Sequence, residues 1–339
     1  MADANMRDLI EKFPTQLNDA IVDLSKMDSS AHKTAAQNFS PSGVLILGMG
    51  GSGIGGAIVE GILLQNSKIP VQSCADYAIP GWVCESTLVV ACSYSGNTEE
   101  TIEAVKTASE RGAKICVVTS GGVLSEMAKE KDWPVVTMPG GHPPRSQFGR
   151  GFTGLAWTLN QFSMFSNEMY ADLASSPAFL NNMVETIVEQ ADSLADLVEN
   201  KIIMIYSDTS TGAIATRMRQ QLNENSKLLV NTHVLPEMNH NELVGWGAGT
   251  NEHVAIILRT PEDNVRTRFR MDFCSDIFRE FEADVIVIDA IGENQMQRLM
   301  YLNQISDWLS LLLAERSGTC PVDIKNIIRL KSALESFNG

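Results

Sequence analysis

Positive charge is scarce in this sequence, which has 26 lysines and arginines against 41 aspartates and glutamates, for a formal net charge of −15. Nucleic acids and anionic membranes would repel such a surface. No apolar run approaches the ~18 residues of a membrane span, and the opening residues MADANMRDLIEK lack the apolar segment of a secretory signal. These absences predict a soluble cytoplasmic protein that binds neither nucleic acid nor membrane.

Cysteine pairs are also missing. None of the six cysteines forms a C-x-x-C pair, the spacing typical of zinc and redox sites, so we expect reduced, mostly buried thiols and no metal site. They are Cys74, Cys84, Cys92, Cys116, Cys274 and Cys320. No G-x-x-x-x-G-K-[ST] motif follows the glycine-rich stretch at 48–56, which argues against a nucleoside triphosphatase.

Short apolar runs, each leading into a turn and a helical pattern, occur in both halves of the chain. They lie at 44–48, 87–93, 114–120, 201–208, 253–259 and 283–290. This alternation is typical of parallel β-sheets covered by helices on both faces. The sequence therefore predicts two similar α/β domains, each a doubly wound parallel sheet in an α/β/α sandwich.

Helical spacing without strands fills the remaining segments. We expect an amphipathic N-terminal helical segment over 1–40, a first domain over 41–165, and linking helices over 166–200. The second domain is expected to span 201–339 and to include a C-terminal helix.

Two turns between a predicted strand and a predicted helix are candidates for phosphate binding. The first, GMGGSG at 48–53, fits the G-x-G-x-x-G pattern of dinucleotide folds, so a nicotinamide-dependent oxidoreductase is one hypothesis. The second, SYSGNTEET, brings the hydroxyls of Ser93, Ser95 and Thr98 to a helix N-terminus. Helix capping explains one hydroxyl, whereas three hydroxyls with free amides suit a terminal phosphate monoester.

Four motifs together resemble a known family. GMGGSGIGG, SYSGNTEET, PPRSQFG and PEMNHNELVGW, in this order, resemble the bifunctional phosphoglucose/phosphomannose isomerases, which are built from two flavodoxin-like sugar isomerase (SIS) domains. The resemblance implies interconversion of fructose 6-phosphate with glucose 6-phosphate and mannose 6-phosphate, with no metal or other cofactor. It also implies a homodimer with a shared active site, and phosphate binding by Gly51, Ser52, Ser93, Ser95 and Thr98.

Aldose–ketose isomerisation through an enediolate requires a base and an acid/base that opens the ring. By resemblance Glu237 is the base, with Glu242 of the same motif as the alternative. His253, sixteen residues further on, matches the family's ring-opening histidine, and His240 is its rival. The family's shared site implies that this histidine acts in the partner subunit's pocket.

A cation must stabilise the enediolate oxygen. Arg145, in a loop rich in proline and glycine, keeps its charge at any working pH. Lys331 matches a C-terminal lysine of the family that assists ring opening, with Lys325 as the alternative. The chain departs from the family at Cys320, which stands before Pro321 where a threonine linked to the acceptance of both epimers is expected.

Other functions also fit a tandem SIS protein. The chain could sense a sugar phosphate without turning it over, or it could isomerise another phosphosugar such as an aminosugar phosphate. The N-terminal 40 residues are too short and too acidic to hold the helix-turn-helix of a DNA-binding sensor.

Overall fold

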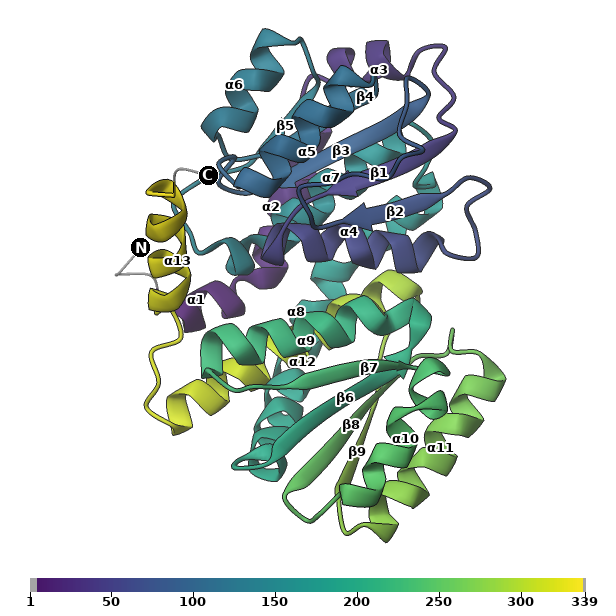
Figure 1. Cartoon of the computed structure of the whole chain (residues 1–339), viewed down its shortest axis with the longest axis vertical. Helices are drawn as coiled ribbons and strands as arrows, with labels where there is room; N and C mark the ends of the chain where they lie inside the picture. The colour runs from purple at the N-terminus through teal and green to yellow at the C-terminus, as the bar shows by residue number, and fades with distance from the viewer. Residues whose placement is uncertain (1–4, 338–339) are drawn as a thin grey trace.

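Two parallel β-sheets organise the chain, one in each half (Figure 1). This computed structural model describes residues 5–337. The first sheet has the order β2-β1-β3-β4-β5 and the second the order β7-β6-β8-β9. The strands are β1 (Gly43–Leu47), β2 (Val71–Cys74), β3 (Thr87–Ser93), β4 (Lys114–Thr119), β5 (Val135–Thr137), β6 (Ile202–Asp208), β7 (Asn231–Leu235), β8 (His253–Arg259) and β9 (Asp284–Asp289). The first order is that of flavodoxin-like folds, and the second repeats its first four positions, so the prediction of two doubly wound halves is confirmed.

Helices cover both faces of each sheet (Figure 1). On the first sheet, α5 (Glu99–Glu110) and α6 (Gly122–Glu130) bury their alanines and Leu124 against the outer face. The inner face packs on α4 (Gly50–Leu63) and α7 (Phe148–Gln161). On the second sheet, α10 (Glu242–Gly245) and α11 (Val265–Glu280) lie outside, while α9 (Gly212–Ser226) and α12 (Gln295–Arg316) lie inside.

One hydrophobic core runs between the two sheets. It contains side chains of α4 and α7 from the first domain and of α9 and α12 from the second, together with α8 (Asn167–Val198). Because this apolar surface is shared, the two domains bury each other's inner helices.

The N-terminal segment forms three helices rather than one: α1 (Met6–Glu11), α2 (Phe13–Lys26) and α3 (Ser30–Ala36). Pro14 stands in the first turn of α2, where its missing N–H costs no helical hydrogen bond, and so marks a new helix start. The predicted amphipathic character is confirmed, since Phe13, Leu17 and Leu24 on one face of α2 are buried.

Among the described residues, no helix combines the length and apolarity of a membrane span.

The C-terminal helix α13 (Lys325–Glu335) has no buried residue. It follows the second domain in sequence but stands out at the side of the molecule in the view of Figure 1. Its apolar side chains face solvent, including Ile328 and Leu330 at 55% and 60% exposure. Such a short helix is marginal in water without a packing partner.

Helix α4 sets the spacing of the candidate site residues. It begins in the glycine-rich turn at Gly50 and ends beside the second domain, where a Cβ on Gly61 would lie 2.4 Å from the Ser210 carbonyl oxygen. Its 14 residues correspond to about 20 Å at 1.5 Å per residue. The carboxyl ends of the two sheets therefore lie at opposite ends of α4.

Candidate active site

The two predicted phosphate-binding turns lie side by side at the carboxyl ends of β1 and β3, which are paired strands. The Ser52 hydroxyl accepts a hydrogen bond from the Tyr94 N–H at 3.0 Å, which joins one turn to the other. A Cβ on Gly53 would lie 2.3 Å from the Gly48 carbonyl oxygen, so the first turn is too tight for any larger residue. A cavity of about 10 Å³ beneath the turns is lined by Gly51, Ser52 and Ser93 and by residues of the 3₁₀-helix η1 (Pro144–Gln147).

The hydroxyls of the second turn are arranged around the N-terminus of α5. Ser93 is buried, accepts from the Gly96 N–H at 3.1 Å, and lies 2.9 Å from the Thr98 hydroxyl. Thr98 is the N-cap residue but its side chain makes no capping bond, so capping does not explain its hydroxyl. Ser95 is exposed and accepts from the Asn97 N–H at 3.2 Å. Free N–H groups of the first helical turn add donors for an anion at this position.

Ser52, Ser93 and Thr98, with the N–H groups at the start of α5, form a candidate phosphate cradle. A Thr98→Val change tests this cradle. We expect it to weaken binding of fructose 6-phosphate about tenfold, because a hydrogen bond to a charged group contributes about 1.5 kcal/mol or more. Calorimetric titration measures the effect. Thr107→Val on the same helix is the matched control, because the Thr107 hydroxyl bonds only the Glu103 carbonyl; equal affinities for the two variants would remove Thr98 from the cradle.

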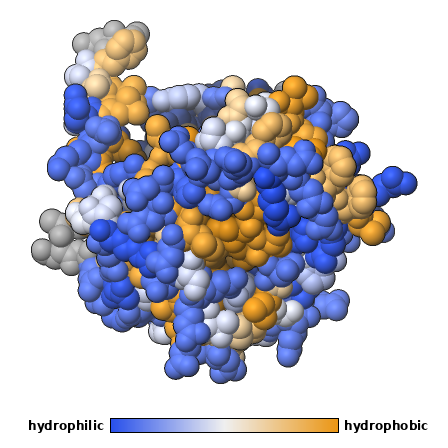
Figure 2. Space-filling view, turned by 90° about the horizontal axis from the view of Figure 1, so that it is seen from below, coloured by the Kyte–Doolittle hydropathy of each residue, from blue (hydrophilic) through white to orange (hydrophobic). Residues whose placement is uncertain are grey.

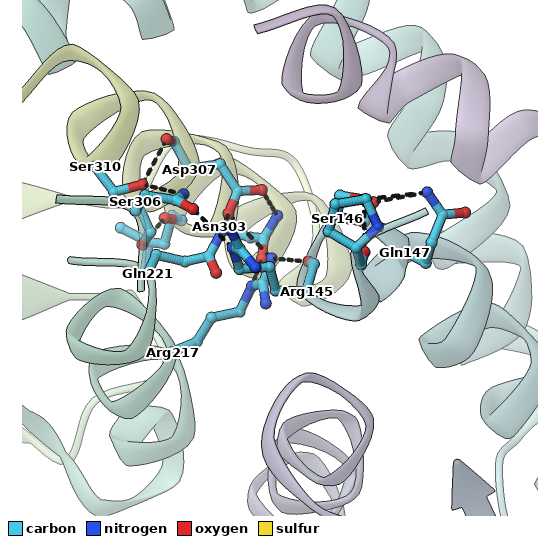
Figure 3. A network of polar contacts seen from close by, with 12 residues as sticks. Arg145, Ser146, Gln147, Arg217, Gln221, Asn303, Ser306, Asp307 and Ser310 are labelled. Atoms are coloured by element: carbon cyan, nitrogen blue, oxygen red, sulfur yellow. Dashed lines mark hydrogen bonds and ion pairs between the residues drawn. The ribbon is translucent and has the colours of Figure 1, made fainter. Parts of the chain in front are cut away.

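Arg145 lies on η1 against the first turn, where a Cβ on Gly51 would be 3.0 Å from its Cα. Its side chain is buried and points toward the second domain (Figure 3). Nε donates to Asn225 at 2.7 Å, Nη1 to Glu224 at 3.1 Å, and Nη2 to the Pro321 carbonyl. A guanidinium has five N–H donors; these bonds use three of them, and the residue is 3% exposed. Burial lowers the pKa of Arg145 despite the attraction of Glu224.

A second buried arginine lies beside it. Arg217 of α9 pairs with Asp307 of α12 at 3.0 Å, and Asn303 also bonds both groups (Figure 3). The guanidinium carbon stands 4.3 Å from the centre of the Phe148 ring. Burial lowers the pKa of Arg217 and raises that of Asp307. Nothing in the sequence pointed to this pair, because charged residues in helical patterns usually face solvent.

We expect Arg217→Ala to lower the free energy of unfolding by about 3–5 kcal/mol, since it leaves the buried Asp307 carboxylate without its partner. Urea unfolding followed by circular dichroism measures this loss. Arg279→Ala is the control, because the exposed Arg279–Asp276 pair contributes at most about 1 kcal/mol. Equal losses for the two variants would contradict a structural role for the buried pair.

The PEMNHNE motif follows β7 at the carboxyl end of the second sheet. Glu237 begins the 3₁₀-helix η3 (Glu237–His240) and is exposed, with one long contact of 3.4 Å from the Asn241 amide. Glu242 begins α10 and is half-buried; its carboxylate bonds the Tyr206 hydroxyl and, at 2.8 Å, His233 Nδ1. Neither Tyr206 nor His233 lies in a motif of the sequence that pointed to function. His240 is exposed at the end of η3.

His253 is the first residue of β8, and its Nδ1 accepts a hydrogen bond from the Thr250 N–H at 3.2 Å. A ring nitrogen that accepts from a backbone amide carries no hydrogen, so Nε2 holds the proton of the neutral imidazole. The ring stands 5.9 Å from the Trp246 ring. This tautomer has an N–H available for donation through Nε2.

Within one chain the structure does not bring the predicted groups together. Leu235, two residues before Glu237, pairs with Asp208 at one end of β6, and His253 pairs with Ile202 at the other. The seven residues of β6 span about 20 Å at 3.3 Å per residue. The Thr209 hydroxyl bonds the Leu235 carbonyl, next to the far end of α4, so Glu237 is also separated from the phosphate turns by most of that helix.

The C-terminal candidates lie on and before α13. Lys331 and Lys325 are exposed, and Lys325 pairs with Asp323 at 2.7 Å. Cys320, the departure from the family pattern, is exposed, and its carbonyl accepts from Lys227 Nζ at 2.8 Å. The carbonyl of the neighbouring Pro321 accepts a hydrogen bond from Arg145. This segment therefore contacts η1, the 3₁₀-helix that lies against the first phosphate turn.

The fold and the two turns place the chain among proteins with SIS domains. A family model described as the SIS domain matches residues 41–142, and one described as the bacterial phospho-glucose isomerase C-terminal SIS domain matches residues 187–334. Among solved structures, the C-terminal domain of glucosamine-fructose-6-phosphate aminotransferase from Francisella tularensis is similar with a TM-score of 0.75. It is 14% identical, and the match covers 94% of this chain and 98% of that one.

Sequence relatives narrow the class. The bifunctional phosphoglucose/phosphomannose isomerase of Aquifex aeolicus is 34% identical over 304 residues, which cover 88% of this chain and 93% of that protein. The chain belongs to the bifunctional phosphoglucose/phosphomannose isomerase family. The D-glucosamine-6-phosphate 4-epimerase of Sulfolobus acidocaldarius is 35% identical over 215 residues, which cover 63% of this chain and 68% of that protein.

Proposed function

We propose that this protein interconverts fructose 6-phosphate with glucose 6-phosphate and mannose 6-phosphate, in the cytoplasm and without a metal. The observation that carries the proposal is the cradle of Ser52, Ser93 and Thr98 beside η1, in a chain of this family. Such a cradle suits the phosphate of a small sugar, whose oxygens accept several donors at once. A dinucleotide-binding site would account for the first turn, but it would leave the hydroxyls of the second turn unexplained.

In the proposed reaction, Glu237 moves a proton between carbons 1 and 2 of the open-chain sugar. Its carboxylate is exposed and accepts only one long contact from Asn241, so its oxygens are accessible to substrate. The proton leaves carbon 2 of the aldose, or carbon 1 of the ketose, and returns to the neighbouring carbon through an enediolate. The remaining N–H groups of Arg145 stabilise the enediolate oxygen.

Ring opening precedes this step: the bond between carbon 1 and the ring oxygen breaks, the ring oxygen takes up a proton, and the carbon-1 hydroxyl gives its proton to solvent water. His253 is the proposed donor in its imidazolium form, acting through Nε2, because Nδ1 lies against the Thr250 N–H. Lys331, which is exposed on α13, is proposed to assist ring opening as a second cation.

We further propose that the active site is shared between two copies of the chain. Groups that act on one sugar must lie within hydrogen-bond reach of it. In a single copy Glu237 and His253 flank opposite ends of β6, a strand about 20 Å long. A second copy can supply the missing group. Figure 2 shows an apolar area at the centre of the face that is seen from below. On α11, Val265, Phe269 and Phe273 are 55–80% exposed and are available for such an interface.

Deuterium exchange tests the proposed chemistry. Fructose 6-phosphate incubated with the protein in D₂O should give aldose phosphates that carry deuterium at carbon 2, because the proton passes through a base that exchanges with solvent. Proton NMR of the products measures the incorporation. Product formed with no deuterium in any turnover would oppose the enediolate route, and the absence of product would oppose the activity.

A second candidate substrate is an aminosugar phosphate. It is favoured by the similarity to the D-glucosamine-6-phosphate 4-epimerase and by Cys320, which replaces the family's threonine. Glucosamine 6-phosphate supplied in place of fructose 6-phosphate separates the two candidates, since the primary proposal predicts faster turnover of fructose 6-phosphate.

A further inference from the structure

The carboxylate of Glu242 is held on both of its oxygens. Oε1 accepts from the Tyr206 hydroxyl, and Oε2 lies 2.8 Å from His233 Nδ1. A carboxylate can only accept, so Nδ1 carries the hydrogen in this pair. Tyr206 and His233 are paired neighbours on β6 and β7, so two adjacent strands hold one side chain of α10.

Tyr206 is itself fixed. It is 1% exposed, stacks on Phe278 at 5.5 Å between ring centres, and its hydroxyl accepts from Trp246 Nε1 at 2.9 Å. Burial and the Glu242 carboxylate raise the pKa of Tyr206, so the phenol stays protonated and donates. Trp246 stacks on Phe278 at 4.1 Å. The chain from Trp246 through Tyr206 to Glu242 is therefore anchored in the core of the second domain.

Glu237 and Glu242 belong to one short segment, joined by Asn241. The Asn241 side-chain oxygen accepts from the Glu242 N–H at 2.6 Å, and its amide nitrogen reaches Glu237 Oε1 at 3.4 Å. The segment is a 3₁₀ turn followed by a four-residue helix, too short to hold a conformation by its own hydrogen bonds. Met238 packs in the core and Asn239 bonds Cys274 and Arg270 of α11. The anchored carboxylate of Glu242 adds the bonds to the sheet, through β6 and β7.

We propose that Glu242 is a positioning residue, which fixes the segment that carries Glu237 and does not itself take the substrate proton. This inference rests on the proposed function and decides between the two glutamates of the motif. A misplaced base loses rate even when its chemistry is intact, and a shift of about 1 Å can cost on the order of 100-fold.

Two replacements of Glu242 distinguish positioning from proton transfer. Glu242→Ala removes both hydrogen bonds and should lower kcat about 10- to 100-fold. KM for fructose 6-phosphate should stay unchanged, because the substitution alters no residue of the phosphate turns. Glu242→Gln should restore kcat to within about threefold of wild type, because the amide oxygen accepts from Tyr206 and the amide nitrogen donates to His233 in its other tautomer. A base cannot be rescued by glutamine.

Tyr206→Phe provides an independent variant on the same chain of bonds. Like Glu242→Ala, it should lower kcat. The double variant Tyr206→Phe, Glu242→Ala should have a kcat only slightly below that of the less active single variant, because both substitutions remove the same hydrogen bond. Thermal melting of every variant identifies any that fails to fold. An unchanged kcat in Glu242→Ala, or a Glu242→Gln variant as inactive as Glu237→Gln, would overturn the positioning role.

Hydrogen–deuterium exchange of residues 237–245 keeps this test separate from the proposed activity. Exchange in that segment should be faster in Glu242→Ala than in wild type, and near the wild-type rate in Glu242→Gln. If wild type turns over no fructose 6-phosphate, the proposed function fails, and the exchange rates still decide whether Glu242 holds the segment. Equal exchange in all three proteins would show that it does not.

Discussion

We expect Glu237→Gln to lower kcat for fructose 6-phosphate by about 10²- to 10⁴-fold, the usual contribution of a general base. Glutamine keeps the size and the contact with Asn241 but cannot accept the proton from carbon 1 or 2. KM should change little, since glutamine keeps the size of the side chain and the residues of the phosphate turns are unaltered. Steady-state kinetics with a coupled assay measures both constants.

The control for this variant is Glu110→Gln, which removes a carboxylate of the same size from the exposed end of α5. It should behave as wild type. The Glu237 assignment predicts that solvent deuterium no longer enters the substrate in Glu237→Gln. A variant that keeps more than a tenth of the wild-type kcat would assign the base elsewhere.

Mixing two inactive variants should restore activity. We expect neither Glu237→Gln nor His253→Ala to turn over fructose 6-phosphate alone. When the two are co-expressed, each mixed dimer should hold one site with an intact glutamate from one copy and an intact histidine from the other. With random pairing in a two-fold dimer, about a quarter of the wild-type activity should return.

We expect this recovery because Glu237 and His253 of one copy flank opposite ends of β6. The strand is about 20 Å long, so one sugar needs the glutamate of one copy and the histidine of the other. A mixture of Glu237→Gln with Glu237→Ala is the control and should stay inactive, because no pairing supplies an intact glutamate. Tagged purification of the mixed dimer gives the activity per site. A purified mixed dimer with no more activity than its parents would mean that both groups serve a site from the same copy.

Five of the six predicted strands lie between two neighbours in their sheet, and the sixth, β9, is an edge strand with the apolar run DVIVID. β1, β3 and β8 read as continuous apolar runs because helices bury them from each side. β2 and β7 lie at sheet edges and are only partly buried, so their polar residues, such as Gln72 and Asn231, gave no strand signal. A polar edge strand such as β2 or β7 forms by pairing with a neighbouring strand, and the sequence does not show which strand that is.

The candidate site was predicted as a set of residues but not as an arrangement. The motifs predict Ser93, Thr98 and Glu237 as site residues, because binding and catalytic residues are often found on loops at the ends of strands. They contain no information on the direction of α4, which separates the phosphate turns from Glu237. Likewise, the contacts of Glu242 with Tyr206 and His233 depend on the pairing of β6 with β7. The polar residues of β7 gave no strand signal, so this pairing could not be predicted from the sequence.

The most direct test of the account is a coupled assay that starts from fructose 6-phosphate in the presence of a metal chelator. Glucose 6-phosphate and mannose 6-phosphate are quantified separately. The account predicts that both form at rates unaffected by the chelator, with Cys320 tolerated in place of threonine. Failure of both products to form, with the protein folded and dimeric, would contradict it.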